Sequence, residues 1–196
     1  MSQFKLPITT ERLELRNFTA ADLDALAAYY TSPDVQRYLD LRARDRSECR
    51  QALDSFCRQV ALNRPGDSLT FAIERSEDNV LIGHVALHWY DATASQAELR
   101  FVMNPKYRRK GYATEAVRAA LDLGFERFRF HRVFARCDAR NQASARMLKK
   151  LGMRLEAHYR EHALFQGEWD EELHFAVLNR EWRRSGKVRE LTHLVA

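Results

Sequence analysis

The stretch that decides the fold of this chain reads Phe101-Val-Met-Asn-Pro-Lys-Tyr-Arg-Arg-Lys-Gly-Tyr-Ala-Thr-Glu-Ala116. It holds the apolar end of a strand, a proline that stops the strand, and a glycine that opens a long helix. The first N–H groups of a helix lack intrahelical partners and carry the positive end of its dipole, so a diphosphate would find donors and favourable charge there. Gly111 would let the anion approach the backbone, and three cations, Arg108, Arg109 and Lys110, would add positive charge. A solvated basic turn before a helix is the alternative, and charge alone favours that alternative.

Length and composition predict one folded domain over residues 1–196, with a core at about 9–183 and a charged tail at 184–196. Apolar residues make up 45% and charged residues 30%, which is ordinary for a globular protein. The chain starts without a basic segment followed by an apolar run, and no stretch is long and apolar enough to span a bilayer. We therefore expect a cytoplasmic protein without membrane contact.

The charged and metal-binding residue types exclude several classes of partner. The net charge of +5 suits an anionic ligand, but Lys and Arg are spread along the chain, so nucleic-acid binding receives only weak support. The three cysteines have no C-x-x-C spacing and the seven histidines are scattered. We expect neither a metal site nor a disulfide framework.

The first third of the chain predicts one strand followed by helices. The strand is expected at 12–16, where polar and apolar residues alternate. Apolar residues at helical spacing predict helices over 19–30, 33–39 and 47–62, and Thr19 with Asp22 resembles an N-capping arrangement.

After the break at Arg64-Pro-Gly-Asp67 the pattern changes period. Strands are expected at 68–74, 80–89 and 97–103, with Ser76-Glu-Asp-Asn79 as the first hairpin turn. A long helix from Gly111 to Phe128, a strand at 131–137 and a helix at 141–151 follow. Asn141 is a good N-cap for the last of these, and Gly152 suits its C-terminal end. Two further strands, at 154–165 and 169–178, flank the turn Gln166-Gly-Glu168, and a short helix is expected from Glu181.

This order of elements, together with two motifs, resembles the GNAT superfamily of acetyl-CoA-dependent N-acetyltransferases. The motifs are Arg108-x-x-Gly111-x-Ala113 after a strand and Asn141-Gln-Ala-Ser-Ala-Arg-Met-Leu-Lys-Lys-Leu-Gly-Met153. The start, Thr10-Glu-Arg-Leu-Glu-Leu-Arg16, and the end, Gln166-Gly-Glu-Trp-Asp170 with Glu181-Trp182, are similar to the Rim-like (RimJ and RimL type) branch. The resemblance covers about residues 9–183.

The resemblance implies an α+β fold with a twisted, mostly antiparallel sheet of about seven strands and helices on both faces. The sheet would be splayed in its middle, between the strand ending at Met103 and the strand from His131. Acetyl-CoA would lie in the gap as cosubstrate, without a metal. The resemblance places the diphosphate on the backbone amides of a loop that comprises Arg108, Arg109, Lys110, Gly111, Tyr112, Ala113 and Thr114.

The family pattern also assigns the pantetheine arm and the reacting groups. Main-chain groups of Phe101, Val102 and Met103 would pair with pantetheine, and an N–H there would stabilise the oxyanion of the tetrahedral intermediate. Asn141 would cap its helix and also bond the pantetheine amide.

The reaction implied is direct attack of a neutral amine on the thioester, which requires a base. Glu98, on the strand before the loop, is the first choice, and its alternative role is an ion pair with a nearby arginine. Glu161 and His162 are further choices. The departing thiolate needs a proton, yet the position of the family's usual tyrosine is Leu148. Rim-like enzymes offer a serine in the same helix, here Ser144, whose alternative role is to satisfy a backbone group in the first turn.

The acceptor implied by the Rim-like resemblance is the α-amino terminus of a protein, of ribosomal-protein type. A small amine, such as a polyamine, an aminoglycoside or an amino-acid derivative, is the second hypothesis. A non-catalytic acyl-CoA-binding module is a third, of another class. A monomer or a homodimer would suit any of these.

Overall fold

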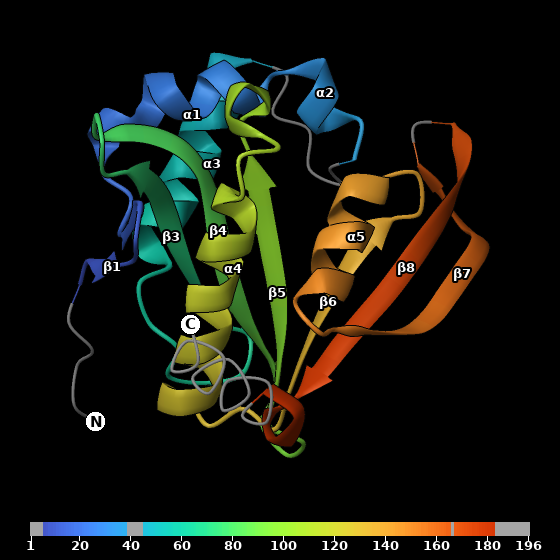
Figure 1. Cartoon of the computed structure of the whole chain (residues 1–196). Coiled ribbons are helices and arrows are strands. Elements are labelled where there is room, and N and C mark those ends of the chain that lie inside the picture. The colour runs from blue at the N-terminus through green and yellow to red at the C-terminus, as the bar shows by residue number, and fades with distance from the viewer. Residues whose placement is uncertain (1–5, 39–44, 166, 183–196) are drawn as a thin grey trace, which may run out of the picture.

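In the computed structural model, which describes residues 6–38, 45–165 and 167–182, one sheet runs through the molecule in the order β1-β2-β3-β4-β5-β6-β8-β7 (Figure 1). All neighbouring strands are antiparallel except β5 and β6. The mixed, mostly antiparallel sheet is therefore confirmed. The strands are β1 (Ile8–Thr9), β2 (Leu13–Arg16), β3 (Ser68–Arg75), β4 (Val80–Asp91), β5 (Gln96–Met103), β6 (Arg132–Asp138), β7 (Arg154–Phe165) and β8 (Glu168–Leu178).

The sheet has eight strands rather than the seven expected, because β1 pairs with β2 over two residues. So short a strand leaves no alternation in the sequence to detect. Both expected hairpin turns are present: β3 and β4 are separated by residues 76–79, and β7 and β8 meet at the turn that contains Gly167. The expected tail, 184–196, and the end of the expected second helix lie outside the described residues.

Helices cover both faces of the sheet, as expected. Figure 1 shows α4 (Tyr112–Asp122) and α5 (Gln142–Lys150) on one face, with both N-termini at the same end of the molecule. The other face carries α1 (Leu23–Tyr30) and α3 (Arg46–Arg58), with η1 (Ala20–Asp22) and α2 (Pro33–Gln36) beside them. Strand alternation explains the division, since Phe71 and Ile73 pack in the core with α4, whereas Ala72 packs with α1 and α3.

Two helices end where the sequence did not predict. The helix expected over 47–62 stops at Arg58, because the main chain of Gln59 then bonds Thr70 and Val60 forms a β-bridge with Leu69. The helix expected to run to Phe128 is α-helical only to Asp122 and continues as the wider π turn η3 (Leu123–Arg127). Periodicity detects the apolar face but does not distinguish an α turn from a π turn.

The sheet parts between β5 and β6, as the resemblance implied. The two parallel strands pair at three positions, Gln96 with Arg132, Ala97 with Val133 and Glu98 with Phe134. The two strands do not pair with each other along the rest of their lengths, which are residues 99–103 of β5 and 135–138 of β6. Each strand keeps its other neighbour, since β5 pairs with β4 up to Met103 and β6 pairs with β8 up to Asp138. The opening therefore lies between two intact halves of one sheet.

Arg16 fixes the start of the helical layer to the sheet. Its guanidinium contacts Glu74 of β3 at 2.7 Å and Asp22 of η1 at 2.8 Å. Asp22 also accepts a hydrogen bond of 2.8 Å from the main-chain N–H of Thr19, which confirms the expected N-capping arrangement. Among the described residues, no helix combines the length and the apolar character that crossing a bilayer demands.

A buried histidine lies between the sheet and the helices α1 and α3. His84 of β4 is 6% exposed and is joined to Tyr29 by a hydrogen bond of 2.9 Å between Nδ1 and Oη. The rings of Phe18, Tyr30 and Phe56 lie around it. Burial lowers the pKa of His84 from 6.5 to about 4, because this apolar environment disfavours the imidazolium.

We predict that His84 makes the fold sensitive to mild acid. Between pH 6.5 and 4 the unfolded chain takes up a proton at this residue and the folded chain does not, so stability falls as the pH falls. The loss reaches about 3 kcal/mol at the lower end of that window. Urea unfolding of the wild type and of His84→Gln at pH 7 and pH 4 measures this loss. Parallel losses in both proteins would contradict the prediction.

Candidate functional site

The basic loop precedes α4 at the end of the molecule where β5 and β6 part. Asn104 and η2 (Pro105–Tyr107) turn the chain out of β5, and Arg109 and Gly111 then adopt left-handed backbone conformations with φ of 63° and 86°. The first intrahelical bond runs from Glu115 N–H to Gly111 C=O. The amides of Tyr112, Ala113 and Thr114 therefore have no intrahelical acceptor and suit an anion.

The loop side chains face solvent. Arg108, Arg109 and Lys110 are exposed, and in the part of the chain that the structure describes Arg108 and Arg109 form no ion pair. Their positive charge is thus available to a ligand. The left-handed Gly111 and the amides that lack an intrahelical acceptor occur together, which would suit an anion. The diphosphate site stays a prediction, and so does its alternative, a solvated turn.

Thr10 and Arg12, in the segment between β1 and β2, hold the basic loop and the start of α4 in place. Glu115 of α4 accepts hydrogen bonds from Thr10 Oγ1 at 2.6 Å and from the main chain and Nε of Arg12, both at 2.8 Å. Arg12 Nη1 donates to the Lys110 carbonyl at 3.0 Å, and its guanidinium lies 4.8 Å from the ring centre of Tyr112. Burial alone would raise the pKa of Glu115, but the bonds from Thr10 and Arg12 lower it below its ordinary value. We call these four residues, Thr10, Arg12, Tyr112 and Glu115, the loop brace.

The side chains at the end of β5 belong to the core. Met103 is buried on the α4 face and Phe101 packs partly against the same core, whereas Val102 packs against the cluster of α1 and α3. Phe101 and Val102 are half-buried, and the main chain of this segment has no partner strand on the β6 side. The pairing of this segment with pantetheine, in which side-chain identity would matter little, stays a prediction.

Glu98 lies at the last paired position of β5, where the opening begins. It is 3% exposed, and its carboxylate accepts hydrogen bonds from Arg100 Nη2 at 2.6 Å and Arg136 Nε at 2.8 Å. Burial would raise the pKa of Glu98, but the two arginines lower it. The ion pair foreseen as an alternative role is thus present. The role of Glu98 as base stays a prediction.

Helix α5 starts on the other side of the opening. Asn141 Oδ1 accepts a hydrogen bond of 3.1 Å from Ser144 N–H, which confirms the predicted N-cap and leaves the Asn141 amide group able to donate. Ser144 is half-buried, and within the described ranges its hydroxyl has no hydrogen-bond partner. Leu148, one turn further on, is fully buried in the core. A side chain at that position therefore points away from solvent, whereas Ser144 is accessible.

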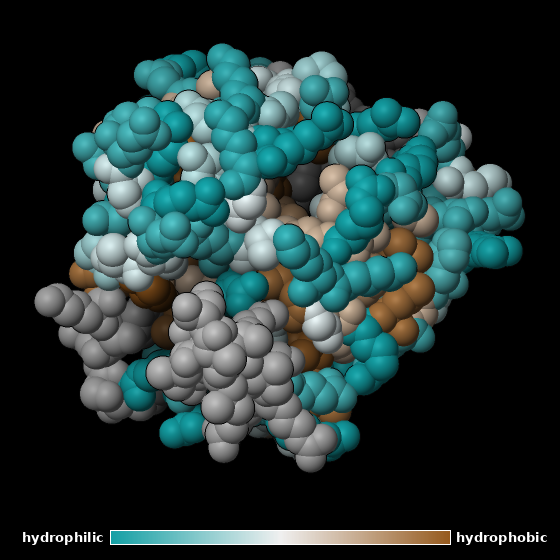
Figure 2. All heavy atoms as spheres, in the orientation of Figure 1, coloured by the Kyte–Doolittle hydropathy of each residue, from teal (hydrophilic) through white to brown (hydrophobic). Residues whose placement is uncertain are grey.

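Figure 2 shows this face of the molecule hollowed between the α4 side and the α5 side, with hydrophobic residues along the wall of the hollow. A second depression, of about 310 Å³, lies beside the start of α5 and is lined by Ala139, Arg140, Trp169 and Glu171. Both depressions adjoin the end of the molecule at which α4 and α5 begin. A long cofactor laid across the opening would lie along this surface.

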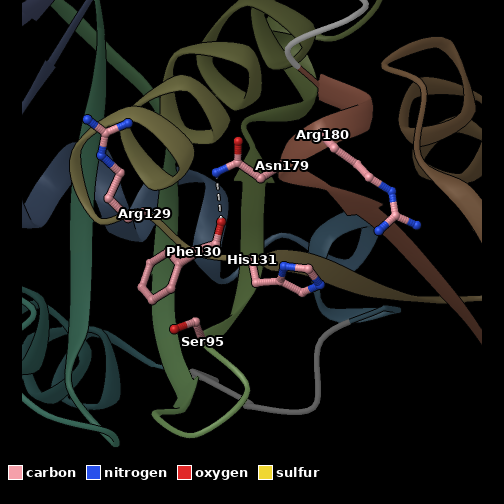
Figure 3. A pocket seen from close by; sticks show the side chains of 6 residues that line it. All are labelled: Ser95, Arg129, Phe130, His131, Asn179 and Arg180. Carbon is pink, nitrogen blue, oxygen red and sulfur yellow. Dashed lines mark hydrogen bonds between the residues drawn. The ribbon is translucent and has the colours of Figure 1, made fainter.

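A larger pocket, of about 510 Å³, occupies the opposite end of β5 and β6 (Figure 3). It is lined by Ser95, Arg129, Phe130, His131, Asn179 and Arg180. Asn179 donates a hydrogen bond of 3.0 Å to the Phe130 carbonyl, and Arg129 and Arg180 lie on opposite sides of the pocket in Figure 3. Because the two cations do not converge, this pocket does not resemble an anion site.

The sequence did not single out several residues that shape this region. Arg12, Arg136, Glu172 and His174 come from segments far from the two motifs, and their contacts depend on strand register. The alternation of polar and apolar residues in 135–138 and 172–175 is the signal that could have found the last three.

Comparison with known proteins identifies the family. Residues 12–154 match the acetyltransferase (GNAT) domain family. An uncharacterized N-acetyltransferase of Bacillus subtilis, YnaD, is 31% identical over 175 residues, which span 89% of this chain and 98% of that protein. The spermidine N(1)-acetyltransferase of Escherichia coli is 23% identical over 93 residues, 47% of this chain and 50% of that protein.

Solved structures agree. A GNAT-family acetyltransferase from Bacillus anthracis superposes with a TM-score of 0.78 at 31% identity, covering 89% of this chain and 99% of that one. A Vibrio cholerae protein, proposed to be a ribosomal-protein-serine acetyltransferase, has a TM-score of 0.73 at 25% identity, with 87% and 96% covered. The chain therefore belongs to the GNAT family of acetyltransferases, and within it to the Rim-like branch. It is an N-acetyltransferase, and acetyl-CoA is the cosubstrate of this family.

We predict that Gly111→Ala weakens acetyl-CoA binding. A Cβ at this left-handed position would lie 3.2 Å from Arg12 Nη2 and would disturb the loop brace. Gly152→Ala is the matched control, because Gly152 has a similar φ of 88° but no neighbour within 4 Å of its Cβ. Both variants should lose about 1 kcal/mol of stability from backbone strain. Only Gly111→Ala should raise the Kd for acetyl-CoA in calorimetry, by about fivefold or more. Equal Kd values for the two variants would contradict the prediction.

Proposed function

We propose that this enzyme transfers the acetyl group of acetyl-CoA to the N-terminal α-amino group of a protein, of ribosomal-protein type. The observation that carries the cofactor placement is the parting of β5 and β6 beside two helix N-termini. A thioester lying at the end of the paired segment would be close to Glu98 on one strand and to Phe134 on the other. The cytoplasm, where acetyl-CoA and nascent ribosomal proteins are present, is the proposed location.

Different residues of the opening bind different parts of the cofactor. The diphosphate binds the amides of Tyr112, Ala113 and Thr114 under the charges of Arg108, Arg109 and Lys110, with Gly111 allowing close approach. Pantetheine takes the place of the missing β6 partner along Phe101, Val102 and Met103, and Asn141 donates to one of its amides from the other side. A free main-chain N–H on β5 stabilises the oxyanion as the amine attacks.

The chemistry requires two proton transfers. The attacking amine loses a proton either to Glu98, as the sequence predicts, or to another group through water. The CoA thiolate leaves with the electrons of the C–S bond, accepts a hydrogen bond from the Ser144 hydroxyl, and takes its proton from solvent. Ser144 suits this role because its hydroxyl is unpaired in the described chain and stands in the first turn of α5, where the helix dipole favours the developing anion.

The β7–β8 hairpin supports a peptide acceptor. Leu164 and Trp169 form a cross-strand pair near its tip, and they are 65% and 59% exposed. An apolar surface of this kind offers contact to the side chains that follow a peptide N-terminus, which a linear polyamine lacks. The similarity to the proposed ribosomal-protein-serine acetyltransferase, which extends over 87% of the chain, supports the same acceptor class.

A small cationic amine is the second candidate. The start of β8 carries Glu168, Asp170, Glu171 and Glu172, and acidic side chains attract polyamines. The spermidine acetyltransferase of Escherichia coli is a relative over about half of the chain. A module that binds acyl-CoA without catalysis is the remaining hypothesis.

We predict that peptides with free N-termini are better acceptors than spermidine. CoA release with N-terminal peptides, the same peptides acetylated at the N-terminus, and spermidine measures the difference. The kcat/KM should favour the free peptide by about tenfold or more, which equals about 1.4 kcal/mol of transition-state binding. Faster turnover of spermidine would contradict the peptide acceptor and favour a small amine. Tight binding of acetyl-CoA without CoA release for any amine would contradict the enzymatic function.

We predict that Ser144→Ala lowers kcat by about tenfold to a hundredfold with little change in the KM for acetyl-CoA, because the hydroxyl acts only as the thiolate develops. Steady-state kinetics with acetyl-CoA and a more reactive acyl thioester provide the check. A better leaving thiolate needs less help from an acid, so the defect should shrink with the activated thioester. An unchanged kcat would leave Ser144 with a structural role alone.

A further inference from the structure

A row of alternating charges crosses three strands at the opening of the sheet. Glu98 of β5 contacts Arg136 of β6 at 2.8 Å, and Arg136 Nη1 lies 3.7 Å from Glu172 Oε2 on β8. The other oxygen of Glu172 lies 2.6 Å from Nε2 of His174. His174 thus ends a continuous series of polar contacts that starts at the last paired residue of β5.

These side chains share the face of the sheet from which an amine would approach. Arg136 is the direct cross-strand partner of His174, so both point to the same side. Their neighbours Ala135 and Leu173 lie on the opposite side, in the core beneath α4 and α5. Since the cofactor loop and both helix N-termini belong to that helical side, the acceptor must reach the thioester from the face that carries His174.

The contact with Glu172 determines which nitrogen of His174 can accept a proton. An ionised carboxylate only accepts hydrogen bonds, so Nε2 carries the hydrogen that it shares with Glu172. In the neutral imidazole Nδ1 then presents its lone pair, and no hydrogen bond to Nδ1 occurs within the described residues. The ring of Tyr159 packs edge-on against the imidazole, with 4.7 Å between ring centres, and limits its rotation. This arrangement is that of an oriented general base.

Glu98 is placed differently. Both of its oxygens already accept hydrogen bonds from arginines, and the side chain is almost fully buried. A proton delivered there would have to displace a guanidinium. The two arginines also lower the pKa of Glu98, which makes it a weak proton acceptor. The contacts of Glu98 suit a role in which it holds Arg136 and Arg100 in position.

We propose that His174, oriented by Glu172, takes the proton of the attacking amine through one intervening water, and that Glu98 positions Arg136 in the same row. The inference rests on the proposed acetyl transfer. The amine nitrogen forms a bond to the thioester carbon, its proton passes to Nδ1 of His174, and the C–S bond breaks with its electron pair on the CoA sulfur. The imidazolium then returns its proton to solvent.

Several charged and titratable groups face His174 and enter its pH response. Glu172 lies on its own strand, Arg136 faces it from β6, and Tyr159, with His162 next to it, faces it from β7. Glu98 and Arg100 lie further along the row, on β5. Glu172 bears the negative charge in contact with the imidazole.

The pH dependence of acetyl transfer tests the proposal, with the acceptor that gives the highest wild-type turnover. If both the amine and His174 must lose a proton, the logarithm of kcat/KM rises with a limiting slope of about two at low pH. His174→Gln should reduce that slope to about one and lower kcat by about a hundredfold, with the Kd for acetyl-CoA unchanged. Glu172→Gln keeps an acceptor for Nε2–H but removes the charge, so it should move the acid limb to lower pH. A purely structural role for Glu172 would not move that limb.

His158→Gln is the matched control. His158 bonds Glu171 at 2.7 Å in the same hairpin, but its cross-strand partner is Leu173, which places this second histidine–glutamate pair on the other face. The control should keep both slope and turnover. A slope of about two in His174→Gln, with loss of that slope in Glu98→Gln, would overturn the proposal and make Glu98 the base.

Nitrogen-15 NMR of the His174 imidazole measures which ring nitrogen carries the hydrogen, and it does not depend on activity. It should show the hydrogen of His174 on Nε2, and a hydrogen on Nδ1 in the neutral ring would overturn the proposal by itself. Failure of the proposed function is distinguishable, because it would appear as absence of CoA release from the wild type with every amine. Failure of this inference alone would leave wild-type turnover intact.

Discussion

The whole arrangement depends on one short ladder, the three residue pairs that join β5 to β6. A parallel ladder of this length holds the two halves of the sheet together at one end and allows them to diverge at the other. Each half is complete without it, because β4 pairs with β5 and β8 pairs with β6 along their lengths. The opening therefore costs only the few hydrogen bonds that a continued ladder would have made. The amide groups of a bound ligand can replace those bonds.

The two halves contribute different chemistry to the opening. The half from β1 to β5 supplies the basic loop, and the loop brace ties that loop to the β1–β2 segment through Glu115. The half from β6 to β8 supplies the start of α5 and the side chains of Arg136, Glu172 and His174. A change in the angle between the halves would move the proton-accepting groups relative to the cofactor without disturbing either core.

Local features of the fold could be predicted from the sequence, whereas contacts between distant strands could not. The apolar face of α4, the N-cap Asn141 and the turn after β3 each depend on a few neighbouring residues, and the structure confirms them. The early end of α3 depends on Gln59 meeting Thr70 across a loop, and the pairing of Glu98 with Arg136 joins residues 38 positions apart. Glu98 could be placed beside an arginine in principle, but which arginine depends on register, and periodicity contains no information on register between strands.

The outer edge of the sheet has a consequence for assembly. Strand β7 lies at the edge of the sheet. Between Tyr159 and Ala163 it has two more residues than its partner β8, and Glu161 there adopts a left-handed conformation with φ of 49°. Such a bulge divides the exposed row of main-chain donors and acceptors into two short stretches with a twist between them. A strand of another molecule would therefore find no continuous row of donors and acceptors to pair with. Pairing would also bring it against the charged side chains of Arg160 and Glu161. The long hairpin can therefore extend into solvent without inviting edge-to-edge polymerisation.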